Sequence, residues 1–210
     1  MFFRRMHLCM IQNMEDLNAF VLAGGRSSRM GTDKALVVFN RQTLLEGSLA
    51  RLSAVSSGTW IVGSREKFSP FGNVVEDEFP DHGPLGGIHA ALRASKADLN
   101  LVLAVDMPFV DVRFLKYLIA KAGAAKAVAT VPRAGGGWQP LCAVYRKRFT
   151  ECAEPALRAG KNKIDPLFAQ CEVQVLEEAE LLKDGFSADL FRNVNTPEEL
   201  AALGKTNCFT

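Results

Sequence analysis

Residues Leu22–Val37 read LAGGRSSRMGTDKALV and follow directly on the apolar run Phe20-Val21-Leu22. The apolar run predicts a buried strand, and Ala23-Gly24-Gly25 ends it, because glycine relaxes the backbone and lets a ligand lie against the amides. Three cations surround these glycines in the sequence: Arg26, Arg29 and Lys34. Ligands of open α/β sheets bind at the carboxyl ends of strands. The stretch therefore predicts a loop that wraps a polyphosphate at one edge of such a sheet.

Two well-known phosphate loops do not fit this stretch. A Walker loop needs four residues between its glycines and a lysine directly after the second, whereas Gly25 and Gly31 are too far apart and Lys34 is displaced. The dinucleotide fingerprint needs G-x-G-x-x-G, which Gly24-Gly25 does not begin. A phosphate-binding loop here must therefore follow another pattern, and the alternative is a glycine turn with a solvated basic face.

Composition predicts a globular protein with one core. The chain has 210 residues, of which 48% are hydrophobic and 23% charged. Its formal charge is +2 and its basic residues are scattered, so we expect no nucleic-acid partner. No segment approaches the ~18 continuous apolar residues of a membrane span. Residues 1–16 carry Arg4 and Arg5 before a short apolar run without a cleavage site, and we expect a flexible N-terminal extension there.

Cysteine usage predicts reduced thiols and a cytoplasmic location. The cysteines are odd in number, far apart and without a Cys-x-x-Cys pair. They are Cys9, Cys142, Cys152, Cys171 and Cys208. No zinc site is expected among them, since no histidine stands near enough to complete one.

Short apolar runs alternate with helical patterns, which predicts βα units and a largely parallel sheet. The expected strands are 19–23, 59–62, 73–76, 99–105, 127–131, 141–145 and 172–176. The expected helices are 44–55, 85–95, 112–122 and 148–159. A last helix is expected from Thr196, which caps it ahead of Pro197 and two acids.

A buried strand, 101–105, ends in Asp106 and is followed by Met107 and Pro108. Aspartate is a poor strand former and is costly to bury unpaired, so a structural reason for Asp106 is weak. Mg²⁺ prefers a carboxylate together with substrate phosphates and waters. We therefore interpret Asp106 as a metal ligand, in preference to a turn or capping residue, a role that Asp111 can fill.

The pattern Leu-Ala-Gly-Gly-x-Ser-x-Arg-Met-Gly-x-Asp-Lys, spelled by Leu22–Lys34, resembles the signature of the molybdenum cofactor guanylyltransferases (the MobA family). That family lies within the Rossmann-like nucleotidyltransferases, and the resemblance extends from about Asn18 to Ala202. It implies a three-layer α/β/α fold with a mostly parallel sheet. It also implies transfer of GMP from GTP to the terminal phosphate of molybdopterin, with Mg²⁺ as cofactor and pyrophosphate as product. Gly24-Gly25 favours the guanylyl branch, because the wider group commonly begins Leu-Ala-Ala-Gly.

Up to about Val110 strands and helices alternate regularly, and beyond it the elements are shorter and more polar. This texture predicts one domain, residues 17–210, with a nucleotide-binding half (17–110) and an acceptor-binding half (111–210). The implied catalytic residues are Arg29, Lys34 and Asp106, with Asp106 as the metal ligand. The implied nucleotide-binding residues are Leu22, Ala23, Gly24, Gly25, Lys34, Asp77, Gly83, Pro84, Leu85, Gly87 and Asp106. The implied acceptor-binding residues are Lys161, Lys163, Asn193 and Asn195.

Gly63 departs from the family pattern, because many guanylyltransferases carry asparagine there; either that contact is lost or Ser64 replaces it. Trp138 is expected to pack rather than to stack on a pterin, and His89 to pack within its helix.

Two alternatives to guanylyl transfer stay open. One is a sister cytidylyl or sugar-phosphate nucleotidyltransferase, and the other a non-catalytic GTP-binding module. Transient contacts with other proteins of molybdenum cofactor synthesis, or with molybdoenzyme chaperones, are compatible with the resemblance.

Overall fold

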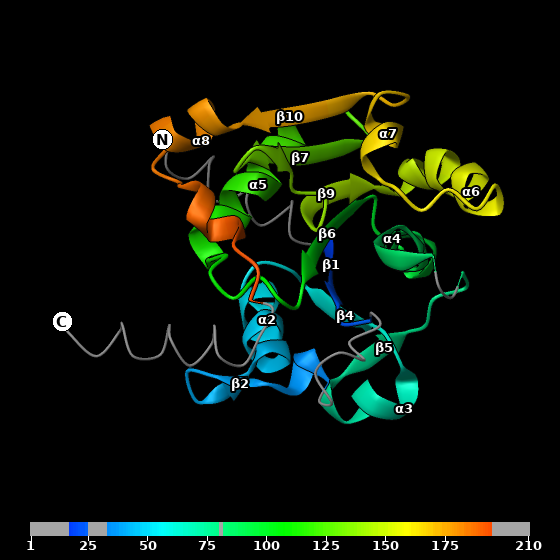
Figure 1. Ribbon diagram of the computed structural model, residues 1–210, viewed down its shortest axis with the longest axis vertical. Helices are drawn as coiled ribbons and strands as arrows, with labels where there is room; N and C mark the ends of the chain where they lie inside the picture. The colour runs from blue at the N-terminus through cyan, green and yellow to red at the C-terminus, as the bar shows by residue number, and fades with distance from the viewer. Residues whose placement is uncertain (1–16, 25–32, 80–81, 195–210) are drawn as a thin grey trace, which may run out of the picture.

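The computed structural model describes residues 17–24, 33–79 and 82–194, and an eight-stranded sheet runs through their centre (Figure 1). Its order is β10-β7-β9-β6-β1-β4-β5, with β8 paired to β7. The strands are β1 (Leu17–Leu22), β4 (Gly58–Val62), β5 (Asn73–Val75), β6 (Leu99–Ala104), β7 (Ala129–Ala134), β8 (Gly137–Trp138), β9 (Cys142–Arg146) and β10 (Val173–Glu177). Four pairings are parallel: β1 with β4, β1 with β6, β4 with β5, and β7 with β10. Three are antiparallel: β9 with β6, β9 with β7, and β8 with β7. The predicted, mostly parallel sheet is confirmed.

Helices cover both faces of this sheet and complete the predicted three-layer α/β/α fold (Figure 1). The α-helices are α2 (Leu44–Ser53), α3 (Arg65–Phe68), α4 (Gly83–Ala94), α5 (Val112–Ala124), α6 (Thr150–Arg158), α7 (Asp165–Phe168) and α8 (Glu178–Lys183). Short 3₁₀ turns are η1 (Lys34–Leu36), η2 (Ser69–Phe71), η3 (Lys147–Phe149) and η4 (Ala188–Phe191). The expected extension 1–16 and the expected helix from Thr196 lie outside the described residues.

Strand β1 shows how the two layers of core arise from one sequence. Its side chains alternate between the faces of the sheet. Leu17, Ala19 and Val21 pack with α2 and α5, whereas Phe20 and Leu22 pack with α4 and α6. Since both faces are covered, almost every residue of the strand is buried, and the strand appears in the sequence as a continuous apolar run.

Helix α2 follows a small hairpin that the sequence analysis missed, formed by β2 (Val38–Phe39) and β3 (Gln42–Thr43). The turn between them places Asn40 and Arg41 at φ of 50° and 70°, the left-handed conformations that two-residue hairpin turns require. Thr43 and Glu46 then form a capping box, in which each side chain accepts a backbone N–H of the other. Hairpin and helix are thereby joined without a loop.

Gly135 and Gly136 form a second tight turn. Both residues have positive φ, 61° and 80°, and join β7 to β8 as a two-residue hairpin. Trp138, in β8, packs against the Phe168 ring at 4.9 Å and lies beneath the guanidinium of Arg133. The expectation that this tryptophan packs is confirmed.

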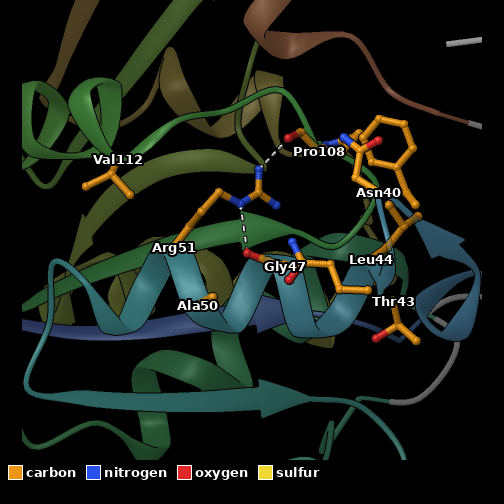
Figure 2. Close-up of a pocket in the computed structure, with 10 residues that line it drawn as sticks. Asn40, Thr43, Leu44, Gly47, Ala50, Arg51, Pro108 and Val112 are labelled. Atoms are coloured by element: carbon orange, nitrogen blue, oxygen red, sulfur yellow. Dashed lines mark hydrogen bonds between the residues drawn. The ribbon is translucent and has the colours of Figure 1, made fainter. Parts of the chain in front are cut away.

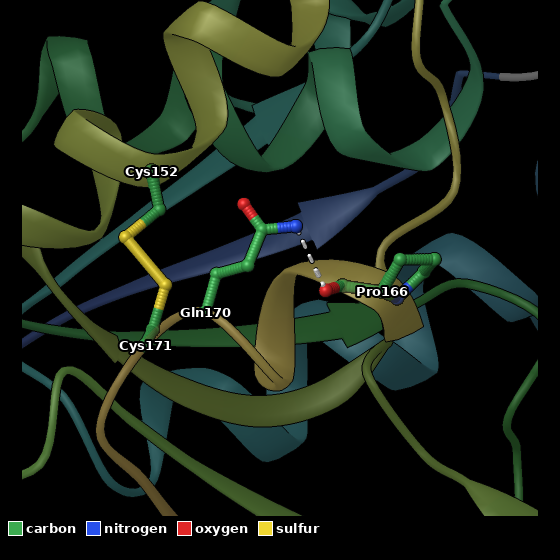
Figure 3. Close-up of a disulfide and its surroundings, with 4 residues drawn as sticks. All are labelled: Cys152, Pro166, Gln170 and Cys171. Atoms are coloured by element: carbon green, nitrogen blue, oxygen red, sulfur yellow. Dashed lines mark hydrogen bonds between the residues drawn. A yellow bond between two sulfur atoms is a disulfide. The ribbon is translucent and has the colours of Figure 1, made fainter.

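The prediction of reduced thiols is wrong for one pair of cysteines. Cys152 on α6 and Cys171 before β10 form a disulfide (Figure 3). Periodicity did not reveal the pair, because α7 turns the chain back and brings residues 19 apart into contact. Cys142 is a free, buried thiol in β9, and burial raises its pKa to about 12.

Within the described ranges, no helix is both long and apolar enough to cross a membrane.

Candidate nucleotide-binding site

A cleft of about 780 Å³ opens where β1, β4, β5 and β6 end. These strands run parallel, so their carboxyl ends meet at one edge of the sheet, where α4 also begins. The cleft is lined by Leu22, Ala23, Gly24, Lys34, Val62, Gly63, Ser64, Glu76, Asp77, Gly83, Pro84, Gly87, Ala104, Val105, Asp106 and Leu141. Nine of the predicted nucleotide-binding residues are among them: Leu22, Ala23, Gly24, Lys34, Asp77, Gly83, Pro84, Gly87 and Asp106.

The remaining predicted residues divide into two groups. Leu85 does not line the cleft, because it points from the first turn of α4 into the core and is fully buried there. Gly25 and Arg29 lie outside the described residues, as does Asn195. The cleft therefore brings together most of the predicted nucleotide residues, and the assignment of Leu85 stays a prediction.

Lys34 and Asp106 meet inside the cleft, although 72 residues separate them in sequence. The Lys34 Nζ donates to Asp106 Oδ2 at 2.7 Å, and both side chains are largely shielded from solvent, with exposed fractions of 14% and 21%. Lys34 opens η1, and the preceding Asp33 caps this turn by accepting the Ala35 N–H. A cation and a carboxylate thus share one partly buried position at the sheet edge.

The second carboxylate oxygen of Asp106 has a different environment. Oδ1 is buried and accepts no hydrogen bond from the part of the chain that the structure describes. A buried carboxylate oxygen without a donor is costly. Asp106 itself lines the cleft, so this unsatisfied oxygen belongs to a residue of the site.

Asp77 lies at the other acidic strand end, two residues beyond β5. Its Oδ1 accepts the Phe79 N–H at 2.8 Å. Burial raises the pKa of Asp77, and the Phe79 N–H and the neighbouring His89 and His82 partly oppose that increase. This carboxyl group lies at the same edge as Asp106 but has no direct lysine or arginine partner among the described contacts.

Gly86 makes room for the Asp77 side chain, a role that the sequence analysis missed. A Cβ added at Gly86 would lie 2.4 Å from Asp77 Oδ2, well inside the contact limit. The glycine run Gly83-Pro84-Leu85-Gly86-Gly87 was a visible signal, but its fourth position was not assigned. The structure shows that a side chain is excluded there because a carboxylate occupies its place.

The start of the glycine loop is attached to β4. The amides of Ala23 and Gly24 both donate to the Val62 carbonyl at 3.0 Å, and Val105 N–H donates to the Leu22 carbonyl at 3.1 Å. These two amides are therefore engaged with the neighbouring strand. Gly24 lines the cleft, and β1, β4 and β6 together hold the start of the loop in place.

The departure at Gly63 has a steric reason. A Cβ there would lie 2.9 Å from Phe68 Cε2, and Phe68 is a buried core residue. An asparagine would collide with this ring, so the chain has no side chain at position 63. The adjacent Ser64 lines the cleft, and its side chain makes no capping bond to α3 although it precedes that helix.

The predicted acceptor-binding residues do not gather in one place. Lys161 and Lys163 are exposed in the segment between α6 and α7, which packs on the α4 face of the sheet. Asn193 is exposed on the opposite face, next to Val194, which packs with α2 and α5. Of these residues, Asn193 is the one near the cleft, because the Val194 N–H donates to the Asp106 carbonyl at 3.0 Å.

His89 confirms its expected packing role. It is 1% exposed on α4 and lies edge-to-face with Phe79 at 5.2 Å. Its Nε2 is 3.6 Å from Glu154 Oε2, too far for a hydrogen bond.

Comparisons with known proteins agree with this geometry. The model of the MobA-like NTP transferase domain family matches residues 19–175. The probable molybdenum cofactor guanylyltransferase of Carboxydothermus hydrogenoformans is 31% identical over 91% of this chain and 97% of its own. The molybdenum cofactor guanylyltransferase of Vibrio parahaemolyticus is 33% identical over 88% of this chain and 93% of its own. A crystal structure of molybdopterin-guanine dinucleotide biosynthesis protein A from Archaeoglobus fulgidus superimposes with a TM-score of 0.77 at 28% identity, covering 90% of this chain and 97% of that one.

Proposed function

This chain belongs to the family of MobA-like NTP transferases, and we infer that it is a molybdenum cofactor guanylyltransferase. It transfers GMP from GTP to the terminal phosphate of molybdopterin and releases pyrophosphate. The observation that carries this inference is the Lys34–Asp106 pair in a cleft at the carboxyl edge of the sheet. Phosphoryl chemistry requires positioning and neutralisation of charge, and this pair supplies both.

The cleft has two ends of different character, and each suits one part of GTP. Lys34 and Asp106 occupy the end beside β1 and β6, which we assign to the triphosphate. Asp77 and the first turn of α4 occupy the other end, which we assign to ribose and base. A carboxylate accepts hydrogen bonds from ribose hydroxyls, and the helix amides can donate to a carbonyl such as guanine O6.

The donor set at Asp106 fits Mg²⁺. Its Oδ1 is a buried hard oxygen to which no group of the described residues donates a hydrogen bond. Mg²⁺ takes one or two carboxylates while the substrate phosphates and waters supply the rest. When bound, the ion would neutralise the phosphate charge and favour departure of pyrophosphate. Lys34 would orient the same phosphates, and its hydrogen bond to Oδ2 holds the Asp106 carboxylate in place.

The reaction balances as a single displacement. An oxygen of the terminal phosphate of molybdopterin attacks the α-phosphorus of GTP and forms a new P–O bond. The bond between the α-phosphorus and the bridging oxygen to the β-phosphate breaks in line, and pyrophosphate carries away that electron pair. Lys34, and Arg29 beyond the described residues, are assigned to the charge that develops on the phosphates.

We place the acceptor on the side of Asn193, next to Asp106, with Asn195 following it in sequence. Lys161 and Lys163 stay candidates for binding an anionic acceptor, at a greater distance.

A cytoplasmic location suits enzymes that consume GTP, and transient contacts with other molybdenum cofactor proteins suit the transfer of its product. Since disulfides are rare in reducing compartments, alkylation of Cys152 and Cys171 in cell extracts tests this location.

Equilibrium binding of GTP, CTP, ATP and UTP, each with and without Mg²⁺, is the experiment that tests this function. A preference for Mg-GTP, followed by release of pyrophosphate on addition of molybdopterin, is the expected result. A preference for CTP would move the protein to a sister cytidylyltransferase with the same site. GTP binding that is independent of Mg²⁺ and unaffected by Asp106→Asn, without pyrophosphate release, would identify a non-catalytic binding module.

A further inference from the structure

Arg51 contacts the segment that follows Asp106 through three of its backbone carbonyls. It lies near the end of α2, and its Nη1 faces the carbonyl oxygens of Met107, Pro108 and Val110 at 3.0, 2.8 and 2.7 Å. The contact with Pro108, and the bond that anchors Arg51 Nε to the Gly47 carbonyl, are drawn in Figure 2. One side chain thus holds three carbonyls of the connection between β6 and α5.

The guanidinium is itself fixed in orientation. Nε donates to the Gly47 carbonyl and Nη2 to Ser48 Oγ, both at 3.0 Å, and Ser48 is fully buried. Burial lowers the pKa of Arg51, a cost that its hydrogen bonds offset. A planar guanidinium held at its base by α2 presents its outer nitrogen in one direction, which a flexible lysine cannot do.

The connection needs such a donor, because it has no regular structure. Carbonyl groups in a partly buried, irregular segment require hydrogen bonds from elsewhere. The Asp106 carbonyl accepts a hydrogen bond from the Val194 N–H at 3.0 Å. Arg51 donates to the carbonyls of Met107, Pro108 and Val110. The Phe109 ring lies beneath the Arg192 guanidinium at 4.6 Å. The segment 106–110 is therefore held from α2 on one side and from residues 192–194 on the other.

We propose that Arg51 is the positioning residue of the Asp106 segment, and that it sets where the carboxylate of Asp106 stands relative to Lys34 and a bound divalent cation. This assignment rests on the proposed nucleotidyl transfer. Arg51 does not line the nucleotide cleft; it acts through the backbone of residues 107–110. A small displacement of a metal ligand is enough to lower the rate strongly, because reacting groups must be held in line.

A second cavity makes the proposal testable by chemical rescue. It has a volume of about 320 Å³ and is lined by Arg51, Gly47, Pro108 and Val112 together with residues of the β2–β3 hairpin (Figure 2). Removal of the Arg51 side chain would enlarge this cavity next to the three carbonyls. Guanidinium ion from solution could then enter and donate to the same oxygens.

The experiment compares Arg51→Ala with Arg113→Ala. Arg113 is a matched control, because its guanidinium also donates to backbone carbonyls, those of Asp184 and Gly185, but away from Asp106. For Arg51→Ala we expect kcat to fall about 30- to 100-fold. The Mg²⁺ concentration for half-maximal GTP binding should rise about tenfold, measured by calorimetry. GTP binding without Mg²⁺ should stay within about twofold of the original protein.

Millimolar guanidinium chloride should restore much of the Arg51→Ala activity, while sodium chloride at equal ionic strength should not. Arg113→Ala should lower the unfolding temperature without changing the Mg²⁺ dependence. If Arg51→Ala keeps the original Mg²⁺ dependence and kcat, or loses activity only in proportion to unfolded protein, the positioning role is wrong. If Arg51→Ala does not fold, Arg51→Lys takes its place, and an unchanged Mg²⁺ dependence in it overturns the role. Absence of Mg-GTP binding by the unaltered protein would instead contradict the proposed function.

Discussion

Asp106 and Asp77 are the same residue type at the same edge of one sheet, yet their surroundings prepare them for different chemistry. Asp106 has Lys34 on one oxygen, and its other oxygen is buried without a donor among residues 17–24, 33–79 and 82–194. Asp77 has a backbone N–H on one oxygen and Gly86 against the other, and burial raises its pKa. Burial raises the pKa of Asp77 and so disfavours its anionic form, whereas Asp106 has a cation, Lys34, as a direct partner. The difference teaches that strand-end position brings a carboxylate into the cleft, and its neighbours decide its role.

The largest effect is expected for Asp106→Asn. The substitution keeps the shape and removes the charge that we assign to Mg²⁺, so kcat should fall about 10²- to 10³-fold. Pyrophosphate release across a Mg²⁺ titration measures it, and the unfolding temperature should change little. Asp189→Asn, on an exposed turn, serves as the control. An Asp106→Asn variant with near-original kcat would remove the distinction between the two aspartates.

Lys34→Ala should lower kcat about 10²-fold, because it removes the cation beside the phosphates and beside Asp106. The loss should not add to that of Asp106→Asn, since the two groups interact directly. Rates of the two single variants and the double variant measure this coupling. Fully additive losses would mean that the pair does not act as a unit.

Gly86→Ala tests the Asp77 end of the comparison. The new methyl group would displace the Asp77 carboxylate, and overpacking of this kind costs about 1–3 kcal/mol. We expect KM for GTP to rise about tenfold while kcat changes far less. In an Asp77→Ala background the same glycine substitution should have little further effect, because the obstructing oxygen is gone. An equal effect in both backgrounds would contradict the steric role of Gly86.

The smallest effect is a pH-dependent gain in stability for Asp77→Asn. Burial raises the pKa of Asp77 above its ordinary value of 3.8, so the folded state retains this proton more readily than the unfolded state. Stability then decreases as pH rises from that value through the folded-state pKa. The variant avoids this loss, and its unfolding temperature should exceed that of the original protein at pH 7, with a smaller difference near pH 4. An equal difference at both pH values would show that ionisation of Asp77 is not the cause.

Most of the fold could be predicted, because parallel strands buried on both faces appear in the sequence as apolar runs. Strands 17–22 and 99–104 and the helix beginning at 112 are within two or three residues of their predicted bounds. The β2–β3 hairpin was missed because its strands are two residues long and its turn contains no glycine. Short helices such as α3 and α7 were missed for a similar reason, since four residues show no period.

The predicted nucleotide residues were found through motifs, and motifs do not state which side chain faces the ligand. Leu85 was included with its glycine neighbours, yet its position on α4 directs it into the core. Ser64, Glu76 and Leu141 also line the cleft, although none of them was assigned to the nucleotide from the sequence. They lie at the ends of strands. The order of the strands in the sheet brings them to the cleft, and the sequence alone did not reveal that order. The acceptor residues were assigned by resemblance, and the fold separates Lys161 and Lys163 from Asn193.

By itself the sequence determined the βα alternation, the glycine loop after the first strand and the aspartate at the end of a buried strand. Apolar periodicity and backbone freedom are local properties, and local properties can be found along a chain. Only the tertiary structure decided that Lys34 meets Asp106, that Gly86 yields its space to Asp77, and that Arg51 holds the segment after Asp106. The contacts of Lys34 and Arg51 join residues 72 and 57 positions apart, and that of Gly86 joins the end of one strand to the next helix. Packing of α2 and α4 against the sheet brings such residues within reach.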